Sequence, residues 1–221
     1  MPSLDVFVIE NVPQLLTKGK QFVEEIKERL SGFEITINKV NSAHYGSAQV
    51  RERAIIIGSK IGKIELPKPI VRLYKTVRQA FEGLTDSTPN QLDYSKSGEE
   101  VKERMSYVQP GGNFKDIPEH LRGKGVHSNS YKRLEWDKQS ITIANPRKSC
   151  VMPPEGNRIL SVRECARLFD LPDSFKFVGT LANKQQMIAN AVPLTLATAI
   201  AKAVKKAFID FYGDRCQFAM A

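Results

Sequence analysis

The stretch Asp5–Pro13 constrains the fold more than any other part of the chain. It contains four consecutive apolar residues, Val6–Ile9. An apolar run without alternation predicts a strand buried on both faces, the type found inside parallel sheets. The run ends at Glu10, and in open α/β sheets ligands bind beyond the carboxyl ends of the strands. The position of Glu10 therefore makes it a candidate for chemistry, although a single glutamate there is more often an exposed capping residue.

Length, charge and cysteine spacing limit the class of protein. The 221 residues suffice for one large domain or two small ones with a buried core. We find no apolar run of transmembrane length and no signal-peptide pattern. Cys150, Cys165 and Cys216 are widely spaced, so neither a metal site nor a disulfide framework is predicted, and a reducing, cytoplasmic compartment fits best. The net charge of +9 favours a polyanionic partner.

Helix and strand patterns alternate in the first part of the chain, and helices dominate its end. This order predicts a mixed α/β fold. Ser161 and Glu164 form the signature of a capping box at the start of one helix, and Pro193 precedes another. The predicted elements are a helix over 18–30, strands over 33–40 and 54–57, and helices over 76–84, 161–168, 183–188 and 194–211.

Three long polar residues precede the strand over 54–57. Gln49, Arg51 and Arg53 occupy alternate positions, and alternate residues of a strand point the same way. We therefore expect the three side chains to share a face, where they could bind a phosphate or a base edge. An exposed basic edge without a ligand is the alternative.

Prolines and glycines interrupt the chain from about residue 66 to 156, and this stretch is predicted to be irregular. Between Arg122 and Lys148 there are seven basic residues against two acidic ones, with aromatic and small polar residues interleaved. Such a mixture provides positive charge for phosphates and hydrogen-bonding groups for bases. A solvated basic face is the alternative. The residues predicted to contact nucleic acid are Arg122, Lys132, Arg133 and Arg147.

Four short blocks of the sequence follow one another in a fixed order. They are Glu10-Asn11-Val12, Gln49-Val50-Arg51-Glu52-Arg53, residues 158–175 and residues 185–193. Together they resemble the C-terminal part of a DNA cytosine-5 methyltransferase: its Glu-Asn-Val motif, its Gln-x-Arg-x-Arg motif, the block that organises its target-recognition domain, and its final motif. Each motif is weakly specific alone, but the four in order span nearly the whole chain. The final motif differs at Ala189, where the family usually has glycine.

The resemblance implies a fold and a division into domains. The fold is the C-terminal part of a Rossmann-like, S-adenosylmethionine-dependent methyltransferase sheet with a small irregular target-recognition domain. Residues 1–75 would belong to the catalytic α/β domain and residues 76–178 to the target-recognition domain. Residues 179–221 would return to the catalytic domain and end in a helix that packs on it.

The resemblance also implies a reaction on cytosine flipped out of double-stranded DNA. A thiolate adds to C6, C5 takes a methyl group from S-adenosylmethionine, and loss of the C5 proton releases the enzyme. Charge would develop at N3 and O2; Glu10, hydrogen-bonded to N3 and the 4-amino group, would stabilise it, and Arg53 would donate to O2. Arg51 would brace the site or a backbone phosphate. The further residues implied are Asn190, Ala191 and Val192 for the cofactor and Gln49 for DNA.

Two features of the family are missing from the sequence. The glycine-rich cofactor loop is not found, and no cysteine follows a proline. We therefore expect the chain to need an N-terminal subunit or segment that supplies the nucleophile, and to be inactive without it. The alternative is a catalytically inactive DNA-binding remnant of such an enzyme. A bacterial or phage origin fits either interpretation.

Overall fold

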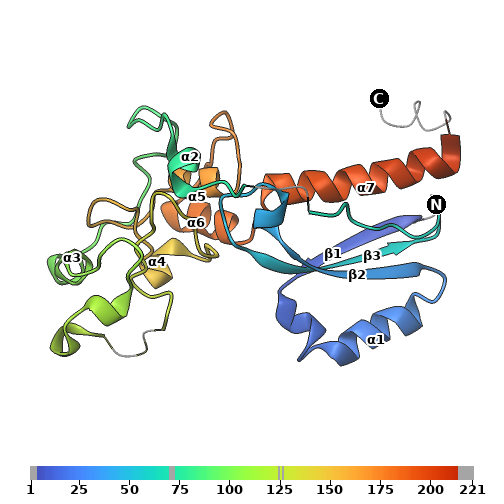
Figure 1. Ribbon diagram of the computed structural model, residues 1–221, viewed down its shortest axis with the longest axis horizontal. Helices are drawn as coiled ribbons and strands as arrows, with labels where there is room; N and C mark the ends of the chain where they lie inside the picture. Colours follow the sequence, from blue (N-terminus) through green and yellow to red (C-terminus); the bar gives the residue numbers. More distant parts are fainter. Residues whose placement is uncertain (1–3, 70–72, 124, 126, 214–221) are drawn as a thin grey trace.

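The computed structural model describes residues 4–69, 73–123, 125 and 127–213. Figure 1 shows two groups of elements side by side. One group is a small sheet with a helix on each face. The other contains short helices joined by long loops. Residues from 214 onward, predicted as a frayed tail, lie outside the described residues.

The sheet has three strands, β1 (Val6–Asn11), β2 (Glu34–Asn41) and β3 (Glu52–Ser59), in the order β1-β3-β2. Both pairings are antiparallel. The prediction of a parallel, doubly buried strand at β1 was therefore wrong for the described strands. β1 lies at the edge, and its Val8 is 41% exposed. The fully buried residues belong instead to the central strand β3, because β3 has a neighbouring strand on either side and a helix over each face.

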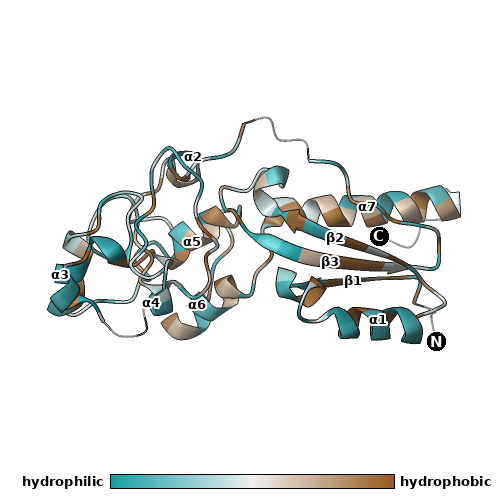
Figure 2. Ribbon diagram, turned by 60° about the horizontal axis from the view of Figure 1, so that its bottom comes forward, coloured by the Kyte–Doolittle hydropathy of each residue, from teal (hydrophilic) through white to brown (hydrophobic). Residues whose placement is uncertain are grey.

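Helices cover both faces of the sheet. The 3-10 helix η1 (Pro13–Leu16) leads into α1 (Lys20–Arg29) on one face, and α7 (Leu194–Tyr212) lies over the other. Leu196 and Ile200 of α7 pack against Ile55 and Ile57 of β3. Figure 2 shows apolar residues concentrated on the strands and a largely hydrophilic outer face on α1. These elements confirm the predicted helices over 18–30 and 194–211 and the predicted strands.

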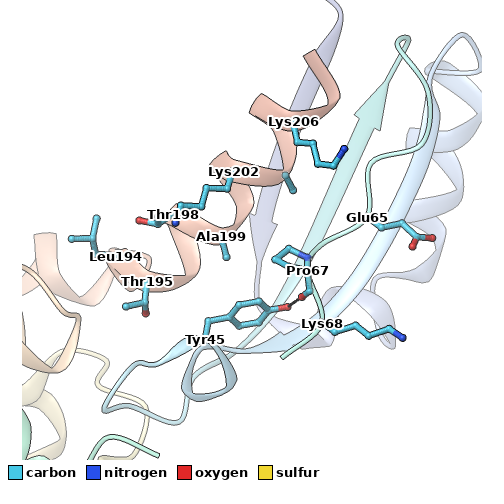
Figure 3. Close-up of a pocket in the computed structure, with 11 residues that line it drawn as sticks. Tyr45, Glu65, Pro67, Lys68, Leu194, Thr195, Thr198, Ala199, Lys202 and Lys206 are labelled. Atoms are coloured by element: carbon cyan, nitrogen blue, oxygen red, sulfur yellow. Dashed lines mark hydrogen bonds between the residues drawn. The ribbon is translucent and has the colours of Figure 1, made fainter. Parts of the chain in front are cut away.

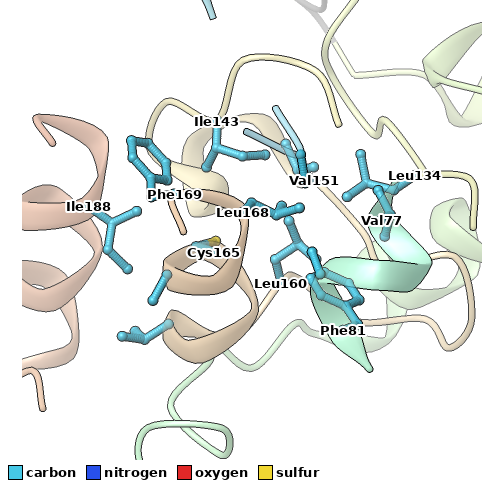
Figure 4. Packing of buried hydrophobic residues seen from close by; sticks show 14 of the residues in the cluster. Val77, Phe81, Leu134, Ile143, Val151, Leu160, Cys165, Leu168, Phe169 and Ile188 are labelled. Carbon is cyan, nitrogen blue, oxygen red and sulfur yellow. The ribbon is translucent and has the colours of Figure 1, made fainter. Parts of the chain in front are cut away.

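The second group is built around α5 (Val162–Leu168). The predicted capping box is present: the Ser161 hydroxyl accepts from the Glu164 amide at 3.0 Å, and the Glu164 carboxylate accepts from the Ser161 amide at 2.8 Å. The side chains around Cys165, Leu168 and Phe169 form a fully buried core (Figure 4). The other elements of this group are α2 (Val77–Phe81), α3 (Glu99–Ser106), α4 (Pro146–Ser149), α6 (Leu181–Ala189), η3 (Phe114–Asp116) and η4 (Glu119–Leu121). The 3-10 helix η2 (Ser42–Tyr45) lies instead between β2 and β3.

Helix α6 packs differently from α7. Its Ile188 belongs to the core around α5, whereas α7 packs on the sheet. The return to the sheet thus begins after α6, and the division at residues 75 and 178 stays a prediction. Within the described residues, no single helix is long and apolar enough to cross a membrane. Only the pair α6 and α7, bent by 49°, meets the length and composition requirement together.

Candidate active site

The structure brings Glu10 and Arg53 together at the end of the sheet. Glu10 of β1 pairs in register with Ile55 of β3, so Arg53 lies diagonally opposite. The Nε atom of Arg53 is 2.6 Å from a carboxylate oxygen of Glu10, and the two side chains are 11% and 28% exposed. A second Arg53 nitrogen donates to the Glu52 carbonyl at 2.7 Å. The pair is therefore partly shielded from water yet accessible from one side.

Arg51 is buried and lines the same cavity as this pair. Its side chain is 3% exposed and donates to the carbonyls of Ile143 and Ala189, each at 2.9 Å. Its guanidinium lies 5.0 Å from the centre of the Phe169 ring. Burial, together with the positive charge of Arg53, lowers the pKa of Arg51 to about 10, although Glu10 opposes the shift. Because it ties β3 to the loop at Ile143 and to the end of α6, Arg51 holds the site together.

The side chain of Gln49 is likewise bonded to the protein's own backbone. It is fully buried, accepts a hydrogen bond from the Ile143 amide at 2.9 Å and donates to the Leu168 carbonyl at 3.4 Å. Gln49 and Arg51 thus both bind the backbone of Ile143, whereas Arg53 turns to Glu10. The expected convergence of three free donors is therefore not found, because Gln49 and Arg51 are bound to the protein's own backbone; the DNA contact of Gln49 stays a prediction.

A cavity of about 280 Å³ opens beside the Glu10–Arg53 pair. This volume is close to the lower end for small-molecule sites and suits a single heterocycle. The exposed Asn190 lies at its border, and its side-chain oxygen accepts from Gln186 at 3.0 Å. The residues that line the cavity are Glu10, Asn11, Val12, Arg51, Arg53, Ala189 and Asn190.

The three residues predicted to contact the cofactor have different surroundings. Ala189 is the last residue of α6 and is not among the residues with positive φ, so the alanine that replaces the family's glycine is unstrained. Ala191 packs against the core around α5, and Val192 packs against the cluster between the sheet and α7. Of the predicted trio, only Asn190 borders the cavity.

Two further cavities follow α6 away from Glu10. One, of about 420 Å³, shares Asn190 with the Glu10 cavity, and the next, of about 570 Å³, shares Asn183 and Gln186 with the first. The last is also lined by Arg147 and Lys148 of α4. Sequence analysis missed this line of amides. The spacing of residues 183, 186 and 190, which recur on one helical face, was the signal available.

Of the four basic residues predicted to contact DNA, Arg122 and Arg147 are exposed, whereas Lys132 and Arg133 are half-buried and buried. Arg147 is exposed in the cavity beside α6. Arg122 is exposed, although its guanidinium donates to the carbonyls of Ile117 and Lys115, each at 2.7 Å. Lys132 is half-buried and donates to the Gly111 carbonyl.

Arg133 is the most deeply buried of the four basic residues. It is 5% exposed and donates to the carbonyls of Val108 and Met105 at 2.7 and 2.8 Å and to Asn157 at 2.7 Å. Burial lowers the pKa of Arg133. Its guanidinium donates mainly to the protein's own backbone, so it stabilises the loops of the second group; its contact with DNA stays a prediction.

The described cysteines lie away from the Glu10 cavity. Cys165 is fully buried in the core around α5, and burial raises its pKa well above the usual value. Burial also raises the pKa of Cys150. Neither lines the cavity, and thiols with raised pKa values are poor nucleophiles. Across the part of the chain that the structure describes, no three His, Cys, Asp or Glu residues gather as a metal site.

Comparison with known families gives one match along most of the chain. The family described as C-5 cytosine-specific DNA methylase matches residues 4–206. The chain is 37% identical over 211 residues to the type II methyltransferase M1.HphI of Haemophilus parahaemolyticus, which covers 90% of this chain and 56% of the relative. It is 31% identical to M.NgoFVII of Neisseria gonorrhoeae, with 94% and 60% covered. The chain thus spans a little over half the length of these curated relatives.

Solved structures show the same fold at lower identity. A protein encoded within an Escherichia coli prophage, described as a DNA modification methyltransferase, matches with a TM-score of 0.71 at 22% identity, covering 92% of this chain and 69% of that one. The Dnmt2 methyltransferase of Schizosaccharomyces pombe matches with a TM-score of 0.60 at 12% identity, covering 93% and 66%. The mixed α/β fold is therefore confirmed.

Proposed function

Because this chain belongs to the C-5 cytosine-specific DNA methylase family, we propose that it supplies the charge-stabilising and DNA-facing parts of a DNA cytosine-5 methyltransferase. The observation that carries this proposal is the Glu10–Arg53 pair beside a cavity sized for one heterocycle. A base can enter such a cavity only after it has left the duplex stack. The proposed substrate is accordingly a flipped cytosine in double-stranded DNA.

The chemistry explains why a carboxyl and a guanidinium belong together there. C5 of cytosine becomes nucleophilic when a thiolate forms a bond to C6, because the electron pair of the C5–C6 double bond is then available at C5. Negative charge also develops at N3 and O2. A protonated Glu10 would donate to N3 and accept from the 4-amino group, and Arg53 would donate to O2. Both contacts strengthen as the charge develops, and with the base bound they would replace the Glu10–Arg53 contact.

Only part of a cofactor site is proposed for this chain. S-adenosylmethionine would supply the methyl group when bound. Of the residues predicted for it, the exposed amide of Asn190 at the border of the cavity fits a polar group of the cofactor. Ala191 and Val192, whose side chains pack into apolar clusters, would contribute backbone groups alone. In the mechanism, the chain's own part is to hold the base edge, shield it from water and stabilise its charge.

The nucleophile is proposed to come from another polypeptide segment, either an N-terminal subunit or an N-terminal region of a longer chain. The two cysteines that the structure describes, Cys150 and Cys165, support this proposal, because both lie outside the cavity and both have raised pKa values. The catalytically inactive DNA-binding remnant is the second candidate, and the same cysteines support it.

We expect the purified 221-residue chain alone not to transfer methyl groups to DNA. With a polypeptide that carries the family's glycine-rich and Pro-Cys motifs, transfer from labelled S-adenosylmethionine to duplex DNA should appear. A Cys→Ser change in the added polypeptide is the control and should abolish it. Robust methylation by this chain alone would contradict the nucleophile assignment. Failure of the combined polypeptides, with DNA binding intact, would favour the inactive remnant.

Residues 76–178 are proposed as the target-recognition domain, with exposed Arg147 among the phosphate contacts. Arg147→Ala should weaken binding to all duplexes similarly and reduce the slope of log K against log salt by about one unit. Fluorescence anisotropy at several salt concentrations measures this. The control is Arg29→Ala on α1, where the arginine is exposed and pairs with Glu25, and its slope should be unchanged. Equal slopes for Arg147→Ala and the unmodified chain would show that α4 is not part of the DNA interface.

A further inference from the structure

The cavity of about 570 Å³ between α4 and α6 has a polar and positively charged lining. Among its lining residues are two cations, Arg147 and Lys148, and four side-chain amides, but no carboxylate. Both cations are exposed, and within the described part of the chain neither takes part in an ion pair. The lining therefore combines unbalanced positive charge with hydrogen-bond donors, and this combination favours an anion.

The donors that an anion would meet can be identified from the hydrogen bonds of the lining. Three of the four amides already make hydrogen bonds within the protein, at 3.0, 3.0 and 3.1 Å; they are Gln185, Gln186 and Asn145. The fourth, Asn183, is exposed, and its side chain makes no hydrogen bond within the described residues. The donors left for an anion are accordingly Arg147 and Lys148 of α4 and Asn183 of α6.

The cavity beside α7 (Figure 3) also has lysines, but they are arranged differently. That cavity measures about 660 Å³, and its Lys68 and Lys202 lie on opposite sides and point apart. No single phosphate would contact both. Arg147 and Lys148, by contrast, are adjacent in one short helix and line the same cavity. Of the two cavities, the one between α4 and α6 is therefore the better anion site.

Two segments connect this cavity to the Glu10 cavity. Along α6, Asn183 lines the first and Asn190 the second, and the cavity of about 420 Å³ between them contains both. On the other side, Asn145 lies two residues after Ile143, whose carbonyl accepts from Arg51 of the Glu10 cavity at 2.9 Å. A helix rises by about 10 Å between positions 183 and 190, which equals about three nucleotide steps of one DNA strand.

We propose that the cavity between α4 and α6 binds a backbone phosphate of the DNA strand that carries the flipped cytosine, about three nucleotide steps from that base. This inference rests on the proposed function, because the base in the Glu10 cavity is its point of reference. Arg147 and Lys148 supply positive charge, and the Asn183 amide donates to a phosphate oxygen. Such contacts fix the register of a strand without reading its sequence, so they hold the strand while the base occupies the Glu10 cavity.

The charge of Lys148 is tested by the binding of the full chain to a labelled duplex of mixed sequence. Lys148→Gln should reduce the slope of log K against log salt by about one unit. The matched control is Lys202→Gln on α7, which removes an exposed lysine outside this cavity and should leave the slope unchanged. Equal reductions by both variants would show general charge attraction and contradict the site.

The contact of Asn183 is neutral, so it has a different signature. Asn183→Leu keeps a similar size and removes the donor, and it should weaken duplex binding by roughly 10-fold at every salt concentration, without changing the slope. Gln21→Leu changes an exposed amide on α1 and should have little effect. An affinity unchanged by Asn183→Leu would remove this residue from the contact and contradict the inference.

The position of the phosphate is tested with a duplex in which one cytosine lies opposite an abasic site, because an unpaired base leaves the stack more easily. An uncharged methylphosphonate about three steps from this cytosine, on the same strand, should weaken binding of the unmodified chain but not of Lys148→Gln. If the two proteins respond equally at every position tested, the assigned phosphate is wrong.

The same cavity could instead hold the cofactor, and ¹H–¹⁵N spectra distinguish the two ligands. The side-chain amide signal of Asn183 should shift with duplex DNA and not with S-adenosylmethionine alone. A shift with S-adenosylmethionine that Lys148→Gln removes would overturn the inference. Duplex binding that none of the substitutions at this cavity alters would also overturn it and leave the proposed function standing, whereas no duplex binding by the unmodified chain would contradict both.

Discussion

Glu10→Gln is expected to slow methyl transfer by roughly 10²–10³-fold in the enzyme completed with the nucleophile-bearing polypeptide. Glutamine keeps the size of the side chain and can still accept from the 4-amino group of cytosine. It cannot deliver a carboxyl proton to N3 as charge develops there. Single-turnover transfer from labelled S-adenosylmethionine measures the chemical step directly.

Glu52→Gln is the matched control for Glu10→Gln. Glu52 is the neighbour of Arg53 in β3, but its carboxylate is half exposed and pairs with Lys39. Its substitution should leave the rate within a few fold, because exposed ion pairs contribute about 0–1 kcal/mol. Affinity for DNA should change little in either variant, since phosphate contacts elsewhere dominate it. A completed enzyme indifferent to Glu10→Gln would contradict the assigned role of this residue.

The elements that sequence analysis predicted correctly depend on local signals. The capping box of Ser161 and Glu164 lies within four residues, and the apolar stripe of α7 repeats along one helix. The helix α3 was missed because it is short and strongly polar and buries Met105 alone. The one-turn helix α4 is too short to show a period.

Strand pairing was not predictable from the apolar run alone. Val6–Ile9 has the composition of an interior strand, yet β1 pairs with β3 alone among the described strands and leaves Val8 partly exposed. The direction of pairing depends on the connections. The segment between β2 and β3 is short and contains only η2, which suits antiparallel neighbours, since parallel strands need a crossover of a dozen or more residues.

The candidate site was predicted only in part, for a similar reason. Glu10 and Arg53 stand at strand ends, where their positions follow from the strands themselves. The burial of Gln49, Arg51 and Arg133 depends on carbonyls far away in the sequence, such as Leu168, Ala189 and Val108. The sequence shows only that a residue is an arginine or a lysine. It does not show whether the side chain binds backbone carbonyls within the protein or is free to bind a phosphate.

The largest expected effect on stability comes from Arg163, the most deeply buried arginine of the second group. Its side chain is fully buried and donates to the carbonyls of Pro89 at 2.7 Å, Pro172 at 3.0 Å and Phe175 at 2.5 Å. Arg163→Met would leave these buried acceptors without a donor, at about 1–3 kcal/mol each, partly offset by the apolar replacement. We expect the free energy of unfolding to fall by about 3–5 kcal/mol, measured by urea denaturation followed by circular dichroism.

Two further variants show whether this loss of stability comes from the missing hydrogen-bond donors of the guanidinium or from its missing positive charge. Arg78→Met, at an exposed arginine that pairs with Asp137, should cost less than about 1 kcal/mol. Arg163→Lys keeps the charge and its attraction to Asp173, which lies 3.5 Å from the guanidinium. A single ammonium cannot reach carbonyls that the planar guanidinium meets from three sides, so lysine should recover only a small part of the stability. Full recovery by lysine would show that the charge, and not the bridging of three loop carbonyls, holds the loops around α5.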